Sequence, residues 1–526
     1  MSFNESVVRK NIAAFLNLIE SGLTLVKEEF FLPNEFGSRG FIDILARDKD
    51  GCLVVIEVKI SKHSEREAIT ELFKYLALLK QNMSLKDSEI RLLVISTDWR
   101  ELLTPFSEFH WNTNYNSAGL MAVVDSSGFP LELKPVELLG RSTGRKINER
   151  HWLQVYESKA GRDVGAVAYA DAIQRRGIKN FVVANFTYEY PDWDVKGYGF
   201  YFAQQEESLD FYKGVLQSFS EELFQEISDC TATYKSDEDI LNEFASASTD
   251  MVYVPADEKE IGHPEKIKGY LQNESWTIEG IARYGIFKKD IRLTDQEIIN
   301  DLCGFSGGSY TWYASTIKLA NKAGFNEVKD RYSKCLYHND TWRRAIRDYI
   351  EYFETKGSDS VMRLSVFNSE NILETITLME RHGELLYVPN FVLAIEDPVL
   401  GELEIFYGSI SVNGQAPKTV KNIARKYFQG SLSNAPMQAF FHAISKINND
   451  ILSDLGLFYD LGYTRIVNGD VISKARNPRI RGSQVISDDF REEDDEGFVG
   501  WLVSNESLVR NISRDYSAAI YNPMEI

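Results

Sequence analysis

Three charged side chains interrupt two apolar runs near the N-terminus. The segments 40–47 and 52–59 are rich in β-branched and aliphatic residues, yet they contain Asp43, Glu57 and Lys59. Burying an unpaired carboxylate costs several kcal/mol, so these charges need partners. Two carboxylates beside a lysine suit a hard divalent cation such as Mg²⁺ or Mn²⁺, whose bound water can attack a phosphoryl group. If they converge, the three residues predict a metal-dependent centre that activates water beside a phosphoryl group.

The turn between the two runs decides whether these side chains can meet. Residues 48–51, Asp-Lys-Asp-Gly, are typical of a β-hairpin. A two-residue loop would place Asp43 opposite Ile56 and would turn Glu57 to the other face of the sheet. A three-residue loop whose final glycine is left-handed would place Asp43 opposite Glu57. We predict the three-residue loop, which brings both carboxylates and Lys59 to one site.

The segments around this hairpin add further polar candidates. A salt bridge of Lys59 with both carboxylates is the simpler alternative to a metal site. The helix predicted for residues 65–81 places Glu71 and Tyr75 one turn apart beside the strand that bears the site. Glu20 lies in the last turn of an upstream helix, where the helix dipole disfavours an anion. A nearby cation would explain that position, and so would exposure to solvent.

The order of these residues resembles a known nuclease signature. Asp43, thirteen intervening residues and then Glu57-x-Lys59 look like the PD-(D/E)xK motif. The first 105 residues resemble the NucS-type endonuclease catalytic domain, a RecB-like branch of that superfamily. The matching features are residues 17–23 of the leading helix, the Glu28-Glu29 pair, residues 40–59, the helix segment 72–75 and the strand 91–95.

This resemblance assigns metal ligands and a catalytic lysine. Asp43 and Glu57 match the metal-binding carboxylates of the family, with the Val58 carbonyl as a third ligand. Lys59 matches the catalytic lysine. An upstream acidic ligand of the family corresponds to Glu20.

The resemblance also implies a substrate-positioning helix, with one departure. The QxxxY motif of the family matches Tyr75, but Glu71 stands where glutamine is expected. Glutamine could donate a hydrogen bond to a phosphate or a base, whereas an ionised glutamate can only accept one. We predict that Glu71 and Tyr75 position the substrate, with contact of Glu71 to the metal or to Lys59 as the alternative.

The chain is long enough for several domains. Residues 1–137 predict an α/β restriction-endonuclease-like domain, in which helices flank a mixed sheet. Residues 138–150 are rich in Gly, Arg and Ser and predict a linker. An α+β C-terminal region follows, which we divide into an α+β domain over 151–270 and a mostly helical α+β domain over 271–526, with a regulatory or oligomerisation role.

Charge and composition limit the possible partners. The chain has 78 acidic and 58 basic residues, a net charge of −20, and residues 1–150 are nearly neutral with 19 basic and 21 acidic side chains. Binding to DNA therefore needs a local basic groove or bound cations rather than bulk charge. The absence of a run of eighteen apolar residues, and of signal-peptide features in residues 1–10, predicts a soluble, cytoplasmic protein that does not bind membranes. The four cysteines are scattered and predict neither a zinc site nor disulfides.

Together these features predict a metal-dependent endonuclease that hydrolyses DNA, with RNA not excluded. Cutting both strands with one centre per chain favours a homodimer or higher homo-oligomer. Bacterial antiphage defence, restriction and DNA repair are the candidate roles, by analogy only. The alternative is a catalytically silent nuclease-fold protein that binds nucleic acid or acts as a scaffold. A serine hydrolase centred on Ser306 of a GxSxG segment is weaker, because such an elbow follows a strand and residues 296–302 predict a helix.

Overall fold

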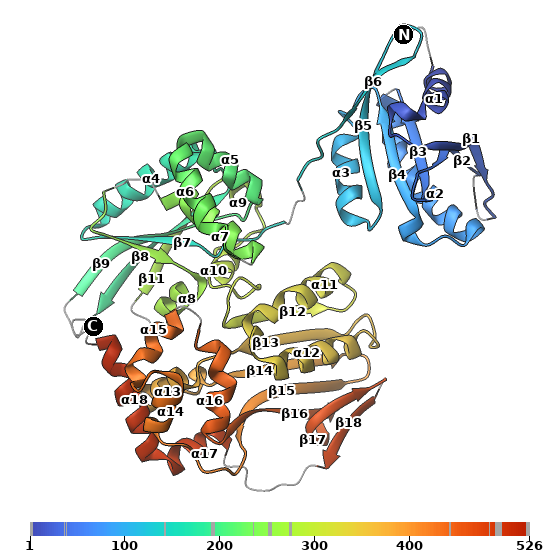
Figure 1. Ribbon diagram of the computed structural model, residues 1–526. Helices are drawn as coiled ribbons and strands as arrows, with labels where there is room; N and C mark the ends of the chain where they lie inside the picture. The colour runs from blue at the N-terminus through green and yellow to red at the C-terminus, as the bar shows by residue number, and fades with distance from the viewer. Residues whose placement is uncertain are drawn as a thin grey trace. The chain divides into compact units, whose positions relative to one another are not determined.

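The chain divides into two compact units, Met1–Gly144 and Arg145–Ile526. The computed structural model, drawn in Figure 1, describes residues 4–35, 37, 39–60, 62–140, 144–190, 195–234, 236–250, 255–272, 276–440, 443–482, 484–489 and 497–521. The division between the units falls within the predicted linker, of which residues 141–143 lie outside the described residues.

A six-stranded mixed sheet forms the centre of the N-terminal unit as described. Its order is β1-β2-β3-β4-β5-β6. Neighbouring strands are parallel from β3 to β5 and antiparallel elsewhere. The strands are β1 (Thr24–Leu32), β2 (Gly40–Arg47), β3 (Leu53–Lys59), β4 (Ile90–Ser96), β5 (Asn116–Val124) and β6 (Pro130–Pro135).

Helices cover both faces of this sheet. The N-terminal helix α1 (Glu5–Ala14) packs Val8 and Ile12 on one face. The crossover helices α2 (Lys62–Met83) and α3 (Leu103–Asn112) pack on the other face, where α2 buries Leu72 and Leu76. Parallel neighbours such as β3 and β4 need such a crossover. The predicted mixed sheet flanked by helices is confirmed.

The C-terminal unit contains two further sheets among its described residues. A five-stranded sheet has the order β10-β7-β9-β8-β11, and a seven-stranded antiparallel sheet runs in sequence order from β12 to β18. The first sheet and its helices comprise β7 (His151–Tyr156), α4 (Lys159–Arg175), β8 (Phe181–Tyr190), β9 (Val195–Gln204), α5 (Leu209–Phe219), α6 (Glu221–Thr231), α7 (Asp237–Asp250), β10 (Glu258–Gly262), α8 (Pro264–Gln272), β11 (Trp276–Arg283), α9 (Ile286–Lys289) and α10 (Asp295–Leu302).

The seven-stranded sheet carries its helices in two groups. Trp342, Ile346 and Tyr349 of α12 pack against one part of the sheet, and α13, α16 and α18 contribute to a second core. The elements are β12 (Trp312–Lys318), α11 (Lys322–Arg331), α12 (Asp340–Phe353), β13 (Val361–Phe367), α13 (Ile372–His382), β14 (Asn390–Asp397), β15 (Glu402–Val412), α14 (Val420–Tyr427), α15 (Ala435–Phe440), α16 (Asn448–Asp454), β16 (Leu457–Val467), β17 (Asp470–Arg481), β18 (Gln484–Asp489), α17 (Gly497–Ser504) and α18 (Glu506–Tyr521).

Two details differ from the predicted division of the C-terminal region. The proposed boundary between 151–270 and 271–526 would cut the five-stranded sheet, because β11 pairs with β8. The second part is also less helical than predicted, since it holds all seven strands of the last sheet. None of the described helices has the length and apolar character that crossing a membrane requires.

Candidate functional site

The β2–β3 turn is the predicted three-residue loop. The N–H of Asp48 donates to the carbonyl of Cys52 at 3.1 Å and so closes residues 49–51 into the loop. Gly51 has φ of +89°, the left-handed region that favours glycine. The prediction is confirmed because turn chemistry is encoded locally, by the glycine and the Asp48 side chain that caps the loop.

The register brings the two carboxylates face to face. The hairpin pairs Ile44 with Ile56, so Asp43 and Glu57 are the next residues on the two strands. At this point a side chain of β2 contacts the backbone of β3: Asp43 Oδ2 accepts the Val58 N–H at 2.9 Å. Because the N–H and C=O of an extended residue point to the same side, the Val58 carbonyl also faces β2.

Lys59 lies between two glutamates. Its Nζ is 2.6 Å from Glu57 Oε1 and 2.6 Å from Glu71 Oε2 on α2. Burial alone would lower the pKa of Lys59, but the charge and hydrogen bond of Glu57, with those of Glu71, raise it above its ordinary value. The side chain is therefore held as an ammonium ion. Contact with Lys59 was the alternative position predicted for Glu71.

Glu57 is the most deeply buried carboxylate of the group. It is 1% exposed, and its pKa is raised well above the usual range, first by burial and then by the charge of Asp43. Its Oε2 has no hydrogen-bond partner among the described residues. A buried oxygen without a partner costs about 1–3 kcal/mol. A cation beside the two carboxylates would satisfy it.

Arg9 is a member of the site that the sequence did not reveal. It extends from α1, is 8% exposed, and its Nη1 lies 3.3 Å from Asp43 Oδ1. The same guanidinium contacts Glu28 at 3.3 Å and Glu29 at 2.8 Å, both on β1. The only sequence signal is a basic residue next to the buried stripe of α1, which is too common to single it out.

Glu20, expected as an upstream metal ligand, is not brought together with Asp43, Glu57 and Lys59 and pairs with Arg91 instead. Its Oε2 lies 2.8 Å from Arg91 Nη2, and the Nη1 of that arginine lies 2.8 Å from Asp48. Arg91 pairs with Val54 on β3, and Glu57 lies three residues farther along, about 10 Å away at 3.3 Å per residue. Glu20 is held in this position by its ion pair with Arg91. The hydrogen bond from Arg91 also lowers the pKa of Glu20.

Tyr75 fixes the strand that carries Asp43. The ring is 3% exposed and the hydroxyl donates to the Phe41 carbonyl at 2.7 Å. Burial raises the pKa of Tyr75 above its ordinary value. The hydroxyl is thus bonded to the backbone of β2, and the substrate-positioning role predicted for Tyr75 would have to act through that strand.

The residues present fit a hydrated divalent cation. No group of three or more His, Cys, Asp or Glu side chains suited to a metal occurs in the described part of the chain. Mg²⁺, however, usually keeps several waters and takes only one or two protein carboxylates. The site has more carboxylates than cations, which leaves an excess of negative charge when all are ionised. The two cations are Arg9 and Lys59, and the five carboxylates are Glu28, Glu29, Asp43, Glu57 and Glu71.

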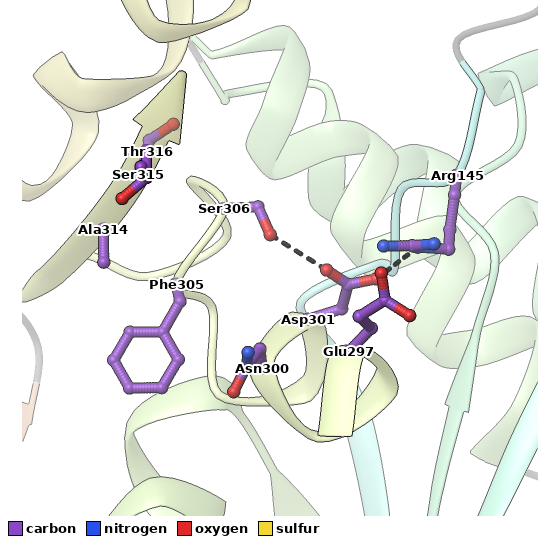
Figure 2. Close-up of a pocket in the computed structure, with 9 residues that line it drawn as sticks. All are labelled: Arg145, Glu297, Asn300, Asp301, Phe305, Ser306, Ala314, Ser315 and Thr316. Carbon is purple, nitrogen blue, oxygen red and sulfur yellow. Dashed lines mark hydrogen bonds and ion pairs between the residues drawn. The ribbon is translucent and has the colours of Figure 1, made fainter. Parts of the chain in front are cut away.

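The environment of Ser306, in the GxSxG segment of the C-terminal unit, differs from that of a catalytic serine. Ser306 lines a cavity of about 440 Å³, and its hydroxyl donates to Asp301 at 2.9 Å (Figure 2). Asp301 also binds Arg145 at 2.6 Å. The preceding residues form helix α10, as predicted, rather than the strand of a nucleophile elbow. A carboxylate tied to arginine also differs from the histidine base that commonly activates serine.

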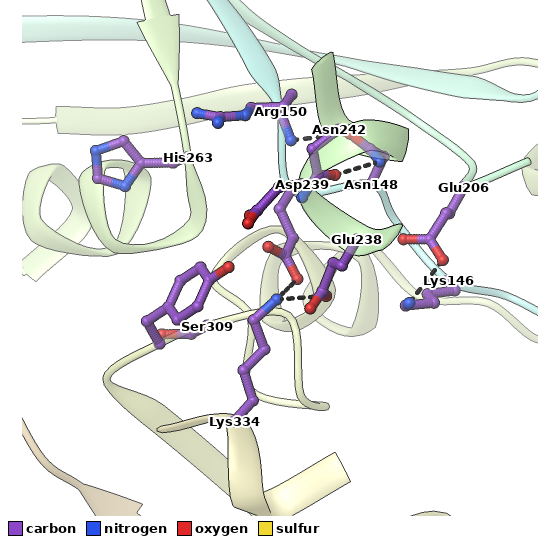
Figure 3. A network of polar contacts seen from close by, with 12 residues as sticks. Lys146, Asn148, Arg150, Glu206, Glu238, Asp239, Asn242, His263, Ser309 and Lys334 are labelled. Atoms are coloured by element: carbon purple, nitrogen blue, oxygen red, sulfur yellow. Dashed lines mark hydrogen bonds and ion pairs between the residues drawn. The ribbon is translucent and has the colours of Figure 1, made fainter. Parts of the chain in front are cut away.

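A buried polar network joins three segments of the same unit. Lys334 lies 2.8 Å from Glu238 of α7 (Figure 3), and it also pairs with Glu149, which precedes β7. Burial, together with the charge of Glu238, raises the pKa of Glu149 to about 7 although Lys334 opposes the shift. Each of these three charges has a partner, which is typical of a structural ion-pair network.

Comparisons with known proteins concern the N-terminal unit. The family described as Endonuclease NucS C-terminal domain matches residues 4–103. Endonuclease NucS of Mycobacteroides abscessus is 32% identical over 81 residues, which span 15% of this chain and 32% of that protein. A solved chain titled "Structure of EndoMS-dsDNA2 complex" is 18% identical over 23% of this chain and 46% of its own length, and its TM-score of 0.18 is too low for the folds to be compared. The N-terminal unit is therefore related to NucS-type nucleases.

Proposed function

We propose that the chain is a metal-dependent endonuclease of the PD-(D/E)xK type that hydrolyses phosphodiester bonds in DNA. The observation that carries the proposal is the hairpin register, which places Asp43 opposite Glu57 with Lys59 two residues farther on. The match of residues 4–103 to the NucS C-terminal domain supports the nuclease class. That match covers a minority of the chain, so substrate and partners are part of the proposal.

Each residue of the site has a chemical role in this proposal. Asp43, Glu57 and the Val58 carbonyl would hold Mg²⁺ or Mn²⁺, which would lower the pKa of a bound water and neutralise charge on a phosphoryl oxygen. Lys59, held as an ammonium ion, stabilises the negative charge that develops on the phosphate. Glu71 keeps that ammonium in place. In this proposal Lys59 acts as a cation beside the phosphate.

The acidic C-terminal unit completes the proposal as a recognition, regulatory or oligomerisation region. A homodimer would supply the second centre needed to cut both strands. Its place in antiphage defence, restriction or DNA repair rests on analogy.

One observation favours the alternative, a nuclease fold that binds without cutting. Lys59 is already paired with Glu57 and Glu71, and Asp43 with Arg9. Such a network could be a permanent set of salt bridges. Binding of a divalent cation separates the two possibilities, because a permanent network would not take one up.

The test is cleavage of plasmid, linear duplex, single-stranded DNA and RNA with Mg²⁺, Mn²⁺ or EDTA. The full chain is compared with Lys59→Ala and with Lys49→Ala, which removes the same charge from the exposed hairpin turn. We expect metal-dependent cutting that Lys59→Ala lowers about 10²–10³-fold and Lys49→Ala leaves unchanged. Full-rate cleavage by folded Lys59→Ala would refute the site. Tight binding of DNA with no cutting and no metal uptake would support the silent alternative.

A further inference from the structure

The facing carboxylates have a buried cation on each side. Lys59 contacts Glu57 on the β3 side, and Arg9 contacts Asp43 on the β2 side. Lys59 belongs to the nuclease signature, whereas Arg9 stands outside it, on the first helix and 34 residues before Asp43. The contact between Arg9 and Asp43 therefore needs an explanation of its own.

The two oxygens of Asp43 are held by different donors. Oδ1 accepts from Arg9 at 3.3 Å, and Oδ2 accepts the Val58 N–H at 2.9 Å. Together these donors fix the rotation of the carboxylate about its last bond. Arginine suits this task because its planar guanidinium presents donors in fixed directions, whereas lysine is a point charge on a flexible stem.

Glu29 also holds Arg9, from a strained position of the backbone on β1. On β1, Glu28 pairs with Ile44 and Phe30 with Ile42, so Glu29 is the residue opposite Asp43. Its φ is +47°, a region that residues other than glycine seldom adopt. The Glu29 carboxylate lies 2.8 Å from Arg9 Nη2. Strained residues of this kind cluster at functional sites, where the surrounding contacts maintain them.

We propose that Arg9 is a positioning residue of the candidate site, which orients Asp43 toward Glu57 and is itself oriented by Glu29. This inference rests on the proposed function, since it assigns Arg9 to the support of a metal ligand. Arg9 touches neither the substrate nor the cation in this proposal, and it acts through Asp43. Partners of metal ligands typically change metal affinity or activity about 10–100-fold when they are mutated.

The experiment measures binding of Mn²⁺ alone to the full chain by electron paramagnetic resonance, without nucleic acid. Arg9→Met removes the charge and the donors, and Arg9→Lys keeps the charge but loses the planar fork. Glu29→Asn removes the carboxylate while keeping a residue that tolerates left-handed backbone. The matched control is Arg47→Met, which removes an exposed arginine four residues along the same strand from Asp43.

We expect Arg9→Met to weaken Mn²⁺ binding about 10–100-fold, with a smaller loss for Arg9→Lys and Glu29→Asn, and no change for Arg47→Met. With DNA, kcat should fall more than KM changes. If Arg9→Met does not fold, Arg9→Lys carries the test, since it keeps a cation among the carboxylates. Unchanged or tighter Mn²⁺ binding by a folded Arg9 variant would overturn the inference.

Failure of this inference differs from failure of the proposed function. A wild-type chain that binds Mn²⁺ and cuts DNA, beside an Arg9→Met variant that does both equally well, contradicts only the role of Arg9. A wild-type chain that neither binds Mn²⁺ nor cuts contradicts the proposed function itself.

Discussion

Glu57 and Glu71 bind the same ammonium group, yet replacing each with glutamine should change stability in opposite directions. Both carboxylates lie 2.6 Å from Lys59 Nζ. Burial and the charge of Asp43 raise the pKa of Glu57 well above its usual value. Burial would also raise the pKa of Glu71, but hydrogen bonds with Glu57 and Lys59 outweigh it and lower the pKa.

The direction of the stability change expected for Glu57→Gln follows from the raised pKa of Glu57. An acid whose pKa is higher in the folded protein than in the unfolded chain contributes stability at low pH, which is lost as the pH rises through the folded pKa. At pH 8, where the unfolded chain holds Glu57 ionised, the fold therefore opposes that charge and Glu57 costs stability. Glu57→Gln should stabilise the N-terminal unit at pH 8 by about 1–3 kcal/mol, or about 3–12 °C in Tm. The gain should shrink toward pH 5.

For Glu71→Gln the expected stability change has the opposite direction. A lowered pKa contributes stability above the unfolded pKa, which is lost as the pH falls through the folded value. Glu71→Gln should therefore destabilise the unit at pH 8. The loss should stay below about 1 kcal/mol, because the side chain is 32% exposed and its ion pair is screened by solvent.

Hydrogen exchange of peptides from β3 and β4, measured against temperature in EDTA, reports this unit separately from the rest of the chain. Glu57→Gln should slow exchange at pH 8 and Glu71→Gln should speed it. Destabilisation by Glu57→Gln at pH 8, or shifts of the same sign for both variants, would refute the reasoning.

Three other predictions concern packing and charge elsewhere. Tyr75→Phe should cost about 1–2 kcal/mol, seen as a lower denaturation midpoint, because it leaves a β2 carbonyl without its donor; an unchanged midpoint would contradict that bond. Gly119→Ala should lower the free energy of unfolding of the N-terminal unit by about 1–3 kcal/mol, and so its Tm, because the new Cβ would lie 2.3 Å from the buried Trp99 ring; an unchanged Tm would contradict that clash. Burial raises the pKa of Glu149 to about 7, so the C-terminal unit should lose stability as the pH rises from about 4.5 through 7, and Glu149→Gln should flatten that part of a calorimetric pH series; a parallel curve would contradict the shift.

Local chemistry explains what could be predicted from the sequence. The hairpin register depends on a glycine and an aspartate within a few residues of the turn, so the meeting of Asp43 with Glu57 could be predicted. The mixed sheet followed from apolar strands that alternate with amphipathic helices. These signals lie within short windows of the chain.

Contacts between residues far apart in the chain explain what could not be predicted from the sequence. Arg9 contacts Asp43 across 34 residues of chain, and Arg91 contacts Glu20 across 71. Neither contact can be recognised from the residues that neighbour these positions in the sequence. For Glu20 the sequence left a nearby cation and exposure to solvent both open; the helix α1 ends earlier, at Ala14, and the cation beside Glu20 is Arg91. In the C-terminal unit, the five-stranded sheet takes its edge strand from beyond a helix, which obscured the boundary.

The most direct test of the central claim compares Asp43→Asn with Glu20→Gln in one cleavage assay with Mg²⁺. Both variants neutralise one carboxylate of the N-terminal unit, but only Asp43 lies opposite Glu57, while Glu20 pairs with Arg91. A nuclease centred on Asp43, Glu57 and Lys59 predicts loss of about 10²-fold or more in Asp43→Asn and near wild-type cutting in Glu20→Gln. Full cleavage by folded Asp43→Asn, or its loss in Glu20→Gln alone, would contradict the account.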